Sequence, residues 1–300
     1  MPWVFVLIWS TGFVVARFGM PHAPPLSFLS TRYALSIVCF GVWIAASHAP
    51  WPRSRDQWFH LAVVGVLIQA GYLGGVWSAV KVGMGAGTVA LLVGLQPVLT
   101  ALWVTLHTPG ASSDAEHAAA RITSRQWLGL ALGLGGLVLV VWRKLGTGEV
   151  TAFSFSMTMI ALLSITVGTL YQKRFVRPCD VRTASTVQML AALVVTLPFA
   201  LLEREPMVMD PELIGAMAWS VLALTLGGSS LLYLLIQRGA ATQVSSLMYL
   251  VPPCTALLAW MLFDEPFTVA MAIGLALTAL GVALVTASVR RPGKARRIGD

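Results

Sequence analysis

Two prolines mark positions in this sequence where a buried polar site could form. Pro97 and Pro252 each lie within a long uncharged segment. A proline inside a helix cannot donate a backbone hydrogen bond, and it leaves the carbonyl oxygen four residues earlier without its usual partner. Interrupted helices at corresponding positions in two halves of a chain are typical of solute sites in membrane transporters. We therefore expect a binding site beside both prolines, with simple packing kinks as the alternative.

Aromatic, hydroxyl and amide side chains in the same and neighbouring segments could line this site. They would offer stacking surfaces and hydrogen bonds, but no fixed charge at mid-depth. A single Ser or Thr more often bonds its own helix or a neighbour, and a Trp can face lipid instead, so each assignment is a hypothesis. The candidate lining residues are Trp9, Ser10, Thr11, Tyr72, Trp77, Gln96, Pro97, Tyr233, Tyr249 and Pro252.

Three basic residues lie close to the expected ends of apolar segments. Arg17, Arg32 and Lys81 fall on the same side of the membrane in the topology derived below. They could form a basic outer mouth that attracts a carboxylate. The alternative is that their long side chains extend to lipid phosphates at the interface.

Motifs for other chemistry are missing from the sequence. It has no GxxxxGK[ST] loop for ATP and no GxSxG nucleophile elbow. The five histidines lack metal-ligand spacing and the three cysteines form no CxxC pair. We therefore expect no catalytic residue, no metal and no cofactor. The net charge of +8 is better explained by membrane loops than by nucleic-acid binding.

The elements that position these residues follow from the distribution of charge. Hydrophobic residues make up 57% of the 300 residues and charged residues only 11%, against about 25% in soluble domains. The uncharged runs are long enough for about ten membrane helices, each needing about 20 apolar residues. We expect helices at 3–20, 26–47, 58–80, 85–106, 125–143, 152–172, 182–202, 212–236, 241–262 and 267–288.

The basic residues predict how this bundle lies in the membrane. With ten helices, both termini share one side, and that side carries fourteen of the twenty Lys and Arg residues. Because cytoplasmic loops are enriched in Lys and Arg, we expect both termini in the cytoplasm. The protein is then a multi-pass component of the cell membrane (inner or plasma membrane), with the lipid bilayer as its surroundings.

The chain also contains an internal repeat. Residues 95–102 share five identities in eight with residues 250–257, at an offset of 155. Residues 129–132 are identical to 274–277, at an offset of 145. We expect two five-helix units, 1–147 and 148–300, the second ending in a short basic tail. Because five is odd, the units have opposite orientations, as in many secondary transporters.

These motifs resemble the EamA-type transporters of the drug/metabolite transporter superfamily, over nearly the whole chain. The residues that carry the resemblance are Trp9-Ser-Thr-Gly12, Gly71 to Trp77, Gly94-Leu-Gln-Pro97, Gly129-Leu-Ala-Leu-Gly133, Pro252 and Asp264-Glu265-Pro266. The resemblance implies an all-α polytopic membrane protein, with ten transmembrane helices as two inverted five-helix repeats around a central cavity. It also implies export of small organic solutes such as amino acids, metabolites or drugs. One departure is that Thr108-Pro-Gly110, the counterpart of the segment with Glu265, lacks an acid.

The leading hypothesis is therefore a secondary transporter that exports a small-molecule substrate by alternating access. No Asp or Glu falls within an expected helix core, and carboxylates usually carry coupled protons, so we expect facilitated export or coupling through unidentified groups. The alternatives are a channel or lipid-handling protein of the same fold, or an intramembrane enzyme. Gly129, Gly133, Gly135 and Gly136 are expected to allow close helix packing or to form a dimer face, so the protein is a monomer or a homodimer.

Overall fold

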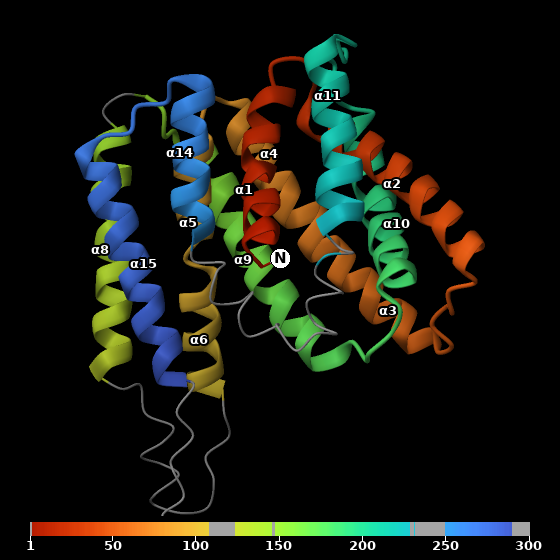
Figure 1. Ribbon diagram of the computed structural model, residues 1–300, viewed down its shortest axis with the longest axis horizontal. Helices are drawn as coiled ribbons and strands as arrows, with labels where there is room; N and C mark the ends of the chain where they lie inside the picture. The colour runs from red at the N-terminus through yellow and green to blue at the C-terminus, as the bar shows by residue number, and fades with distance from the viewer. Residues whose placement is uncertain (1, 108–123, 146–147, 229–230, 232–249, 290–300) are drawn as a thin grey trace, which may run out of the picture.

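The computed structural model describes residues 2–107, 124–145, 148–228, 231 and 250–289 (Figure 1). Within these residues the secondary structure is helical throughout, with no strand, which confirms the expected all-α class. The helices are α1 (Pro2–Gly19), α2 (Pro25–Ser47), α3 (Arg55–Val64), η1 (Gly65–Leu73), α4 (Gly74–Lys81), α5 (Ala86–Val93), α6 (Gln96–His107), α8 (Ser124–Leu145), α9 (Ala152–Phe175), α10 (Val181–Ala200), α11 (Pro211–Trp219), η2 (Ser220–Gly227), α14 (Val251–Phe263) and α15 (Val269–Val289).

Four of the described helical spans are long and apolar enough to cross a membrane, and six shorter apolar helices accompany them. The described spans follow the expected ranges to within a few residues, except that parts of the expected helices 212–236 and 241–262 lie outside the described residues. Two spans contain π-helical segments, η1 and η2, that apolar content alone does not indicate. Segments of this kind are frequent at functional sites.

Local sequence explains where many helices begin. Ser54, Asp180 and Asp210 each accept a hydrogen bond from a backbone N–H in the first turn of the helix that follows. Thr151 forms a reciprocal capping box with Ser154 at the start of α9. Such caps satisfy donors that a helix end leaves unpaired. The helix boundaries therefore follow from polar residues that interrupt the apolar pattern.

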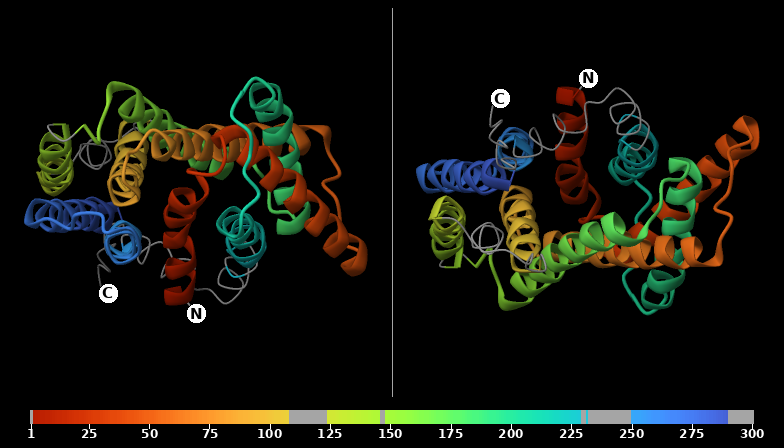
Figure 2. Two further views of the ribbon diagram at one scale, coloured as in Figure 1. Left: turned by 90° about the horizontal axis from the view of Figure 1, so that it is seen from above. Right: turned by 90° about the horizontal axis from the view of Figure 1, so that it is seen from below.

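The helices form two groups joined by a central set. Helices α8 and α15 lie side by side at one end of the molecule, while α2, α3 and α10 lie at the other (Figures 1 and 2). Glycines allow the contact between α8 and α15. A Cβ added at Gly136 would come within 2.6 Å of the Gly274 carbonyl oxygen, and one added at Gly281 would clash with the Gly129 carbonyl oxygen. The expected close packing thus occurs between two helices of the same chain.

Connections between helices alternate between the two ends of the bundle. Residues 20–24, 82–85, 201–210 and 264–268 lie at the upper end in Figure 1, and residues 48–54 and 176–180 lie at the lower end. The terms upper end and lower end are used in this sense below.

Candidate functional site

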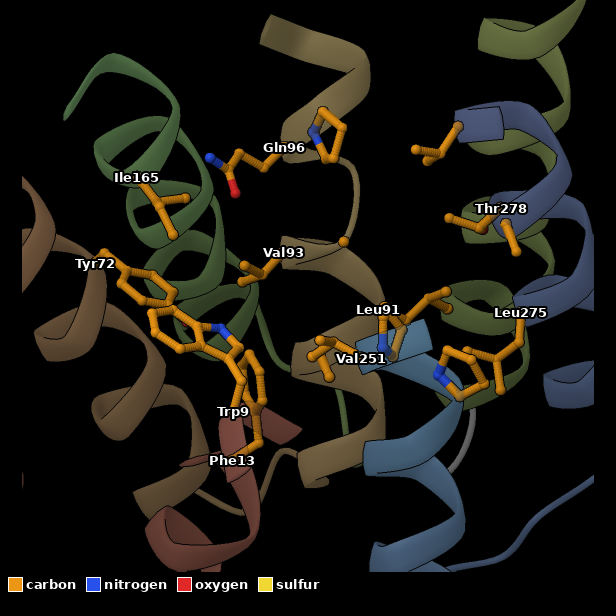
Figure 3. Close-up of a pocket in the computed structure, with 17 residues that line it drawn as sticks. Trp9, Phe13, Tyr72, Leu91, Val93, Gln96, Ile165, Val251, Leu275 and Thr278 are labelled. Atoms are coloured by element: carbon orange, nitrogen blue, oxygen red, sulfur yellow. The ribbon is translucent and has the colours of Figure 1, made fainter. Parts of the chain in front are cut away.

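A cavity lies between α1, η1, α5, α6, α9, α14 and α15 (Figure 3). Its lining is mostly apolar and aromatic, with Gln96 and Thr278 among the few polar side chains. The cavity volume is about 70 Å³, well below the roughly 300–1,000 Å³ of pockets that hold small-molecule ligands. A solute the size of an amino acid would therefore need the surrounding helices to separate.

The predicted helix interruption forms one wall of this cavity. Helix α5 ends at Val93, residues Gly94 and Leu95 turn, and α6 begins at Gln96. Pro97 follows within the first turn of α6, where its missing N–H costs least, so the break falls just before it. The break places Gln96 at the cavity, where its Nε2 atom donates to Thr169 Oγ1 at 3.2 Å.

The second of the two prolines lies against the break between α5 and α6. Pro252 belongs to the first turn of α14 and also lines the cavity. A Cβ added at Gly94 would come within 2.7 Å of Pro252 Cγ, so only glycine leaves room for the proline ring. The two proline-containing segments, far apart in sequence, thus meet at one point of the cavity wall.

Five of the ten predicted lining residues are brought together at this cavity. They are Trp9, Tyr72, Gln96, Pro97 and Pro252. Tyr233 and Tyr249 lie outside the described residues.

The three other predicted lining residues make contacts within the helix bundle and do not line the cavity. Ser10 donates to the Val6 carbonyl oxygen at 2.8 Å, and Thr11 donates to the Ile8 carbonyl oxygen at 2.6 Å, as expected for hydroxyls within helices. Trp77 is fully buried, with its ring stacked on Phe28 at a centroid distance of 4.4 Å, and it does not line the cavity.

The three predicted mouth cations occupy different environments. Lys81 pairs with Glu205 at the upper end, and Arg17 lies 3.9 Å from Glu265 there. Arg32 is 8% exposed and lies inside the bundle, where its Nε and Nη2 atoms donate to Thr225 Oγ1 at 3.4 and 3.1 Å. Arg32 therefore lies inside the bundle, apart from Arg17 and Lys81 at its upper end.

Two carboxylates bind the N-terminus of α5 at the upper end. Glu265 accepts from the Ala86 N–H at 3.0 Å, and Glu149 accepts from the Gly85 N–H at 3.1 Å. Lys144 pairs with Glu149 at 2.6 Å. Helix N-termini favour anions, so these acids are held by the first turn of α5. We call Glu149, Glu265 and the α5 N-terminus the upper clamp.

Sequence reasoning recognised Glu265 but missed Glu149, because an acid in a short connection shows no periodic pattern. The glycine-rich segment 83–87 turns the chain from α4 into the first turn of α5, with Gly83 at φ 97°. Its N–H groups also bind anions, supplied by the chain's own carboxylates.

The comparisons with known proteins agree with this architecture. A solved structure superposes with a TM-score of 0.65 over 95% of both chains at 20% identity, which shows the fold. An uncharacterized transporter of Archaeoglobus fulgidus is 23% identical over 94% of both chains. A protein of Escherichia coli K12 named as a probable amino-acid metabolite efflux pump is 23% identical over 92% of this chain and 90% of its own length.

A further relative in Escherichia coli K12, an uncharacterized inner membrane transporter named YedA, is 24% identical over 93% of this chain and 87% of its own length. A sequence model of the EamA-like transporter family matches residues 3–108 and 152–287, which make up most of the chain. With the helical fold and the interrupted helix α5–α6 at the cavity, these matches show that the chain belongs to the EamA-like transporter family.

Proposed function

We propose that this protein exports small organic solutes, such as amino acids or related metabolites, by alternating access around the cavity. The observation that carries the proposal is the interrupted helix α5–α6, which places Gln96 at a cavity otherwise lined mainly by apolar and aromatic groups. Two relatives named as probable amino-acid metabolite efflux pumps support the substrate class.

The contacts of the upper clamp support the proposal that the cavity is closed toward the upper end. Helix α5 runs from the clamp at Ala86 to the cavity wall at Val93, about 10 Å along the helix axis. Its first turn is held by carboxylates from two different connections. Releasing these contacts would free α5 to move away from α14, which widens the cavity toward the upper end.

An inverted repeat would supply the two gates that such a cycle requires. Support comes from the π-helical segments, since η2 begins at Ser220, 155 residues after Gly65 at the start of η1. The same offset relates Pro97 to Pro252. Two units at 1–147 and 148–300, rocking about the cavity, would open it alternately to each side.

The positive-inside pattern supports an upper end that faces outward, with both termini in the cytoplasm. The name of the inner membrane transporter YedA supports the inner membrane as the location. Since the acids lie outside the helix cores, we propose that the solute gradient drives export without coupled protons.

Comparing the metabolites released by cells that overproduce the protein with those released by cells lacking it tests the function. We expect a small set of organic solutes to accumulate in the medium of the overproducing cells and to be retained in cells without the protein. Identical external and internal profiles, with the protein present in the membrane, would contradict the proposal. Unselective release of many small ions would indicate a channel instead.

A further inference from the structure

Arg32 is a buried cation that lacks a counter-ion in the described part of the chain. It lies seven residues after the start of α2, about 10 Å along the helix axis. A guanidinium carries five N–H donors, and two of its nitrogens share a single acceptor, Thr225 Oγ1. Most of its hydrogen-bonding capacity therefore has no acceptor among the described residues.

Six of the seven described carboxylates near this end of the bundle have other partners, and the seventh, Asp264, follows α14, which packs against α1 and α5. The partners of the six are Lys81 for Glu205, His22 for Asp210 and Glu212, the α2 N-terminus for Glu203, and the α5 N-terminus for Glu149 and Glu265. The sequence between residues 228 and 250, most of which lies outside the described residues, contains no Asp or Glu. These contacts leave the Arg32 guanidinium without a carboxylate partner among the described residues.

Unpaired hydroxyls accompany this cation. Ser36 lies one helical turn beyond Arg32 on the same face of α2, and Ser220 begins η2. Both side chains are fully buried, and their oxygen atoms have no hydrogen-bond partner among the described residues. Thr225, which binds Arg32, donates to the Ser220 carbonyl oxygen at 2.9 Å. We call Arg32, Ser36, Ser220 and Thr225 the Arg32 cluster.

Helix α2 links the Arg32 cluster to η1, the segment that contributes Tyr72 to the cavity wall. Arg32 donates to Thr225 of η2, and the next residue, Tyr33, donates to the Gln69 carbonyl oxygen of η1 at 2.7 Å. Two adjacent residues of α2 therefore contact both π-helical segments. Tyr72, also in η1, lines the cavity. Movement of either π-helical segment would therefore alter the separation between the cluster and the cavity.

We propose that the Arg32 cluster binds the carboxylate group of the transported solute and so selects organic acids and zwitterions over their neutral analogues. This inference rests on the proposed function, and it adds the group that the transporter recognises. A charge inside a membrane bundle is costly and typically marks a substrate or ion pathway. The planar guanidinium suits a carboxylate, which can accept two parallel hydrogen bonds from it. The two serine hydroxyls supply further donors.

Binding to the purified protein tests this assignment independently of transport. The probes are three acid and amide pairs: benzoate and benzamide, phenylalanine and phenylalaninamide, and leucine and leucinamide. Competition and equilibrium binding are measured in a neutral detergent, so that an anionic lipid phosphate does not replace the probe. The variants are Arg32→Gln, Arg32→Lys and, as a control that removes an exposed cation, Lys173→Gln.

We expect the wild-type protein to prefer at least one acid over its amide by about ten- to hundredfold, as hydrogen bonds to charged groups imply. Arg32→Gln should abolish this preference, whereas Arg32→Lys should restore part of it and Lys173→Gln should keep it. A purely structural Arg32 would weaken acid and amide binding equally, which would overturn the proposal. So would a wild-type protein that prefers no acid.

Two further variants keep the test decisive if Arg32→Gln does not fold. Ser36→Ala and Ser220→Ala remove hydroxyls that make no hydrogen bond, so the fold should tolerate them. Each should lower the acid preference severalfold, and an unchanged preference in both would overturn the assignment. If acid preference is present but cells export no organic solute, the proposed function fails while the carboxylate site stands.

Discussion

Removing the charge of Glu265 should open the upper end of the protein. The carboxylate accepts from the Ala86 N–H at 3.0 Å and lies 3.9 Å from Arg17, and its side chain is 11% exposed. A carboxylate at a helix N-terminus contributes about 0.3–1 kcal/mol, and up to about 2 kcal/mol when partly buried. Glu265→Gln should therefore weaken the closed state by about 1–2 kcal/mol, which raises the open population roughly 5- to 30-fold.

Cysteine labelling measures this change. In a protein whose three cysteines are replaced by alanine, Ala90→Cys places one thiol in the lining of the cavity. We expect a membrane-impermeant maleimide, added outside intact cells, to label it about 5 to 30 times faster in the Glu265→Gln variant. The control is Glu212→Gln, since Glu212 lies at the same end but pairs with His22. An unchanged labelling rate, or an equal increase in the control, would refute the clamp.

Three further predictions concern packing, pH and energy coupling. Gly136→Ala should destabilise the α8–α15 contact by about 1–3 kcal/mol, because its Cβ would meet the Gly274 carbonyl oxygen, whereas Gly135→Ala faces open space and should be neutral in thermal unfolding. Arg182 hydrogen bonds hold the pKa of Asp180 below its ordinary value of 3.8. The stability that Asp180 adds over Asp180→Asn should therefore persist at neutral pH and shrink in unfolding curves only as the pH falls below about 4. Finally, solute-driven flux in proteoliposomes should leave the internal pH unchanged, and a strong solute-driven pH change would indicate proton coupling.

Much of the fold follows from where the charges are absent. The uncharged runs predict the helical spans to within a few residues, since hydrocarbon requires long apolar helices with paired backbones. Pro97 also predicts the break at Gly94 and Leu95. The π-helical segments were not predicted, because a change from four- to five-residue hydrogen bonding leaves the apolar pattern intact. The close approach of Gly65, at the start of η1, to the Gln188 carbonyl oxygen was likewise invisible in the sequence, although an added Cβ would clash there.

The candidate site was harder to predict because hydropathy does not show which face of a helix a side chain occupies. Trp77 and Trp9 both occur in apolar segments, yet one stacks on Phe28 and the other lines the cavity. Only the packing of distant helices separates the two cases. Membership of a helix was not enough to assign a role to either tryptophan.

Arg32 shows a different limit of the sequence. Its place inside the expected helix 26–47 was a signal that it is not a mouth residue, because six positions separate it from the start of that range. Its partner, Thr225, follows 193 residues later, and the absence of a counter-ion in the described part of the chain is visible only when the other carboxylates are located. Charge counting alone therefore grouped it with Arg17 and Lys81.

The most direct test of the central claim is solute export by proteoliposomes containing variants of the cavity wall. The solutes are those that cells export only when the protein is present. We expect Gln96→Ala and Trp9→Ala to reduce export at least tenfold at equal protein content, while Trp142→Ala, which removes a tryptophan that is 75% exposed, has little effect. Full export by both cavity variants would contradict a solute pathway through this cavity.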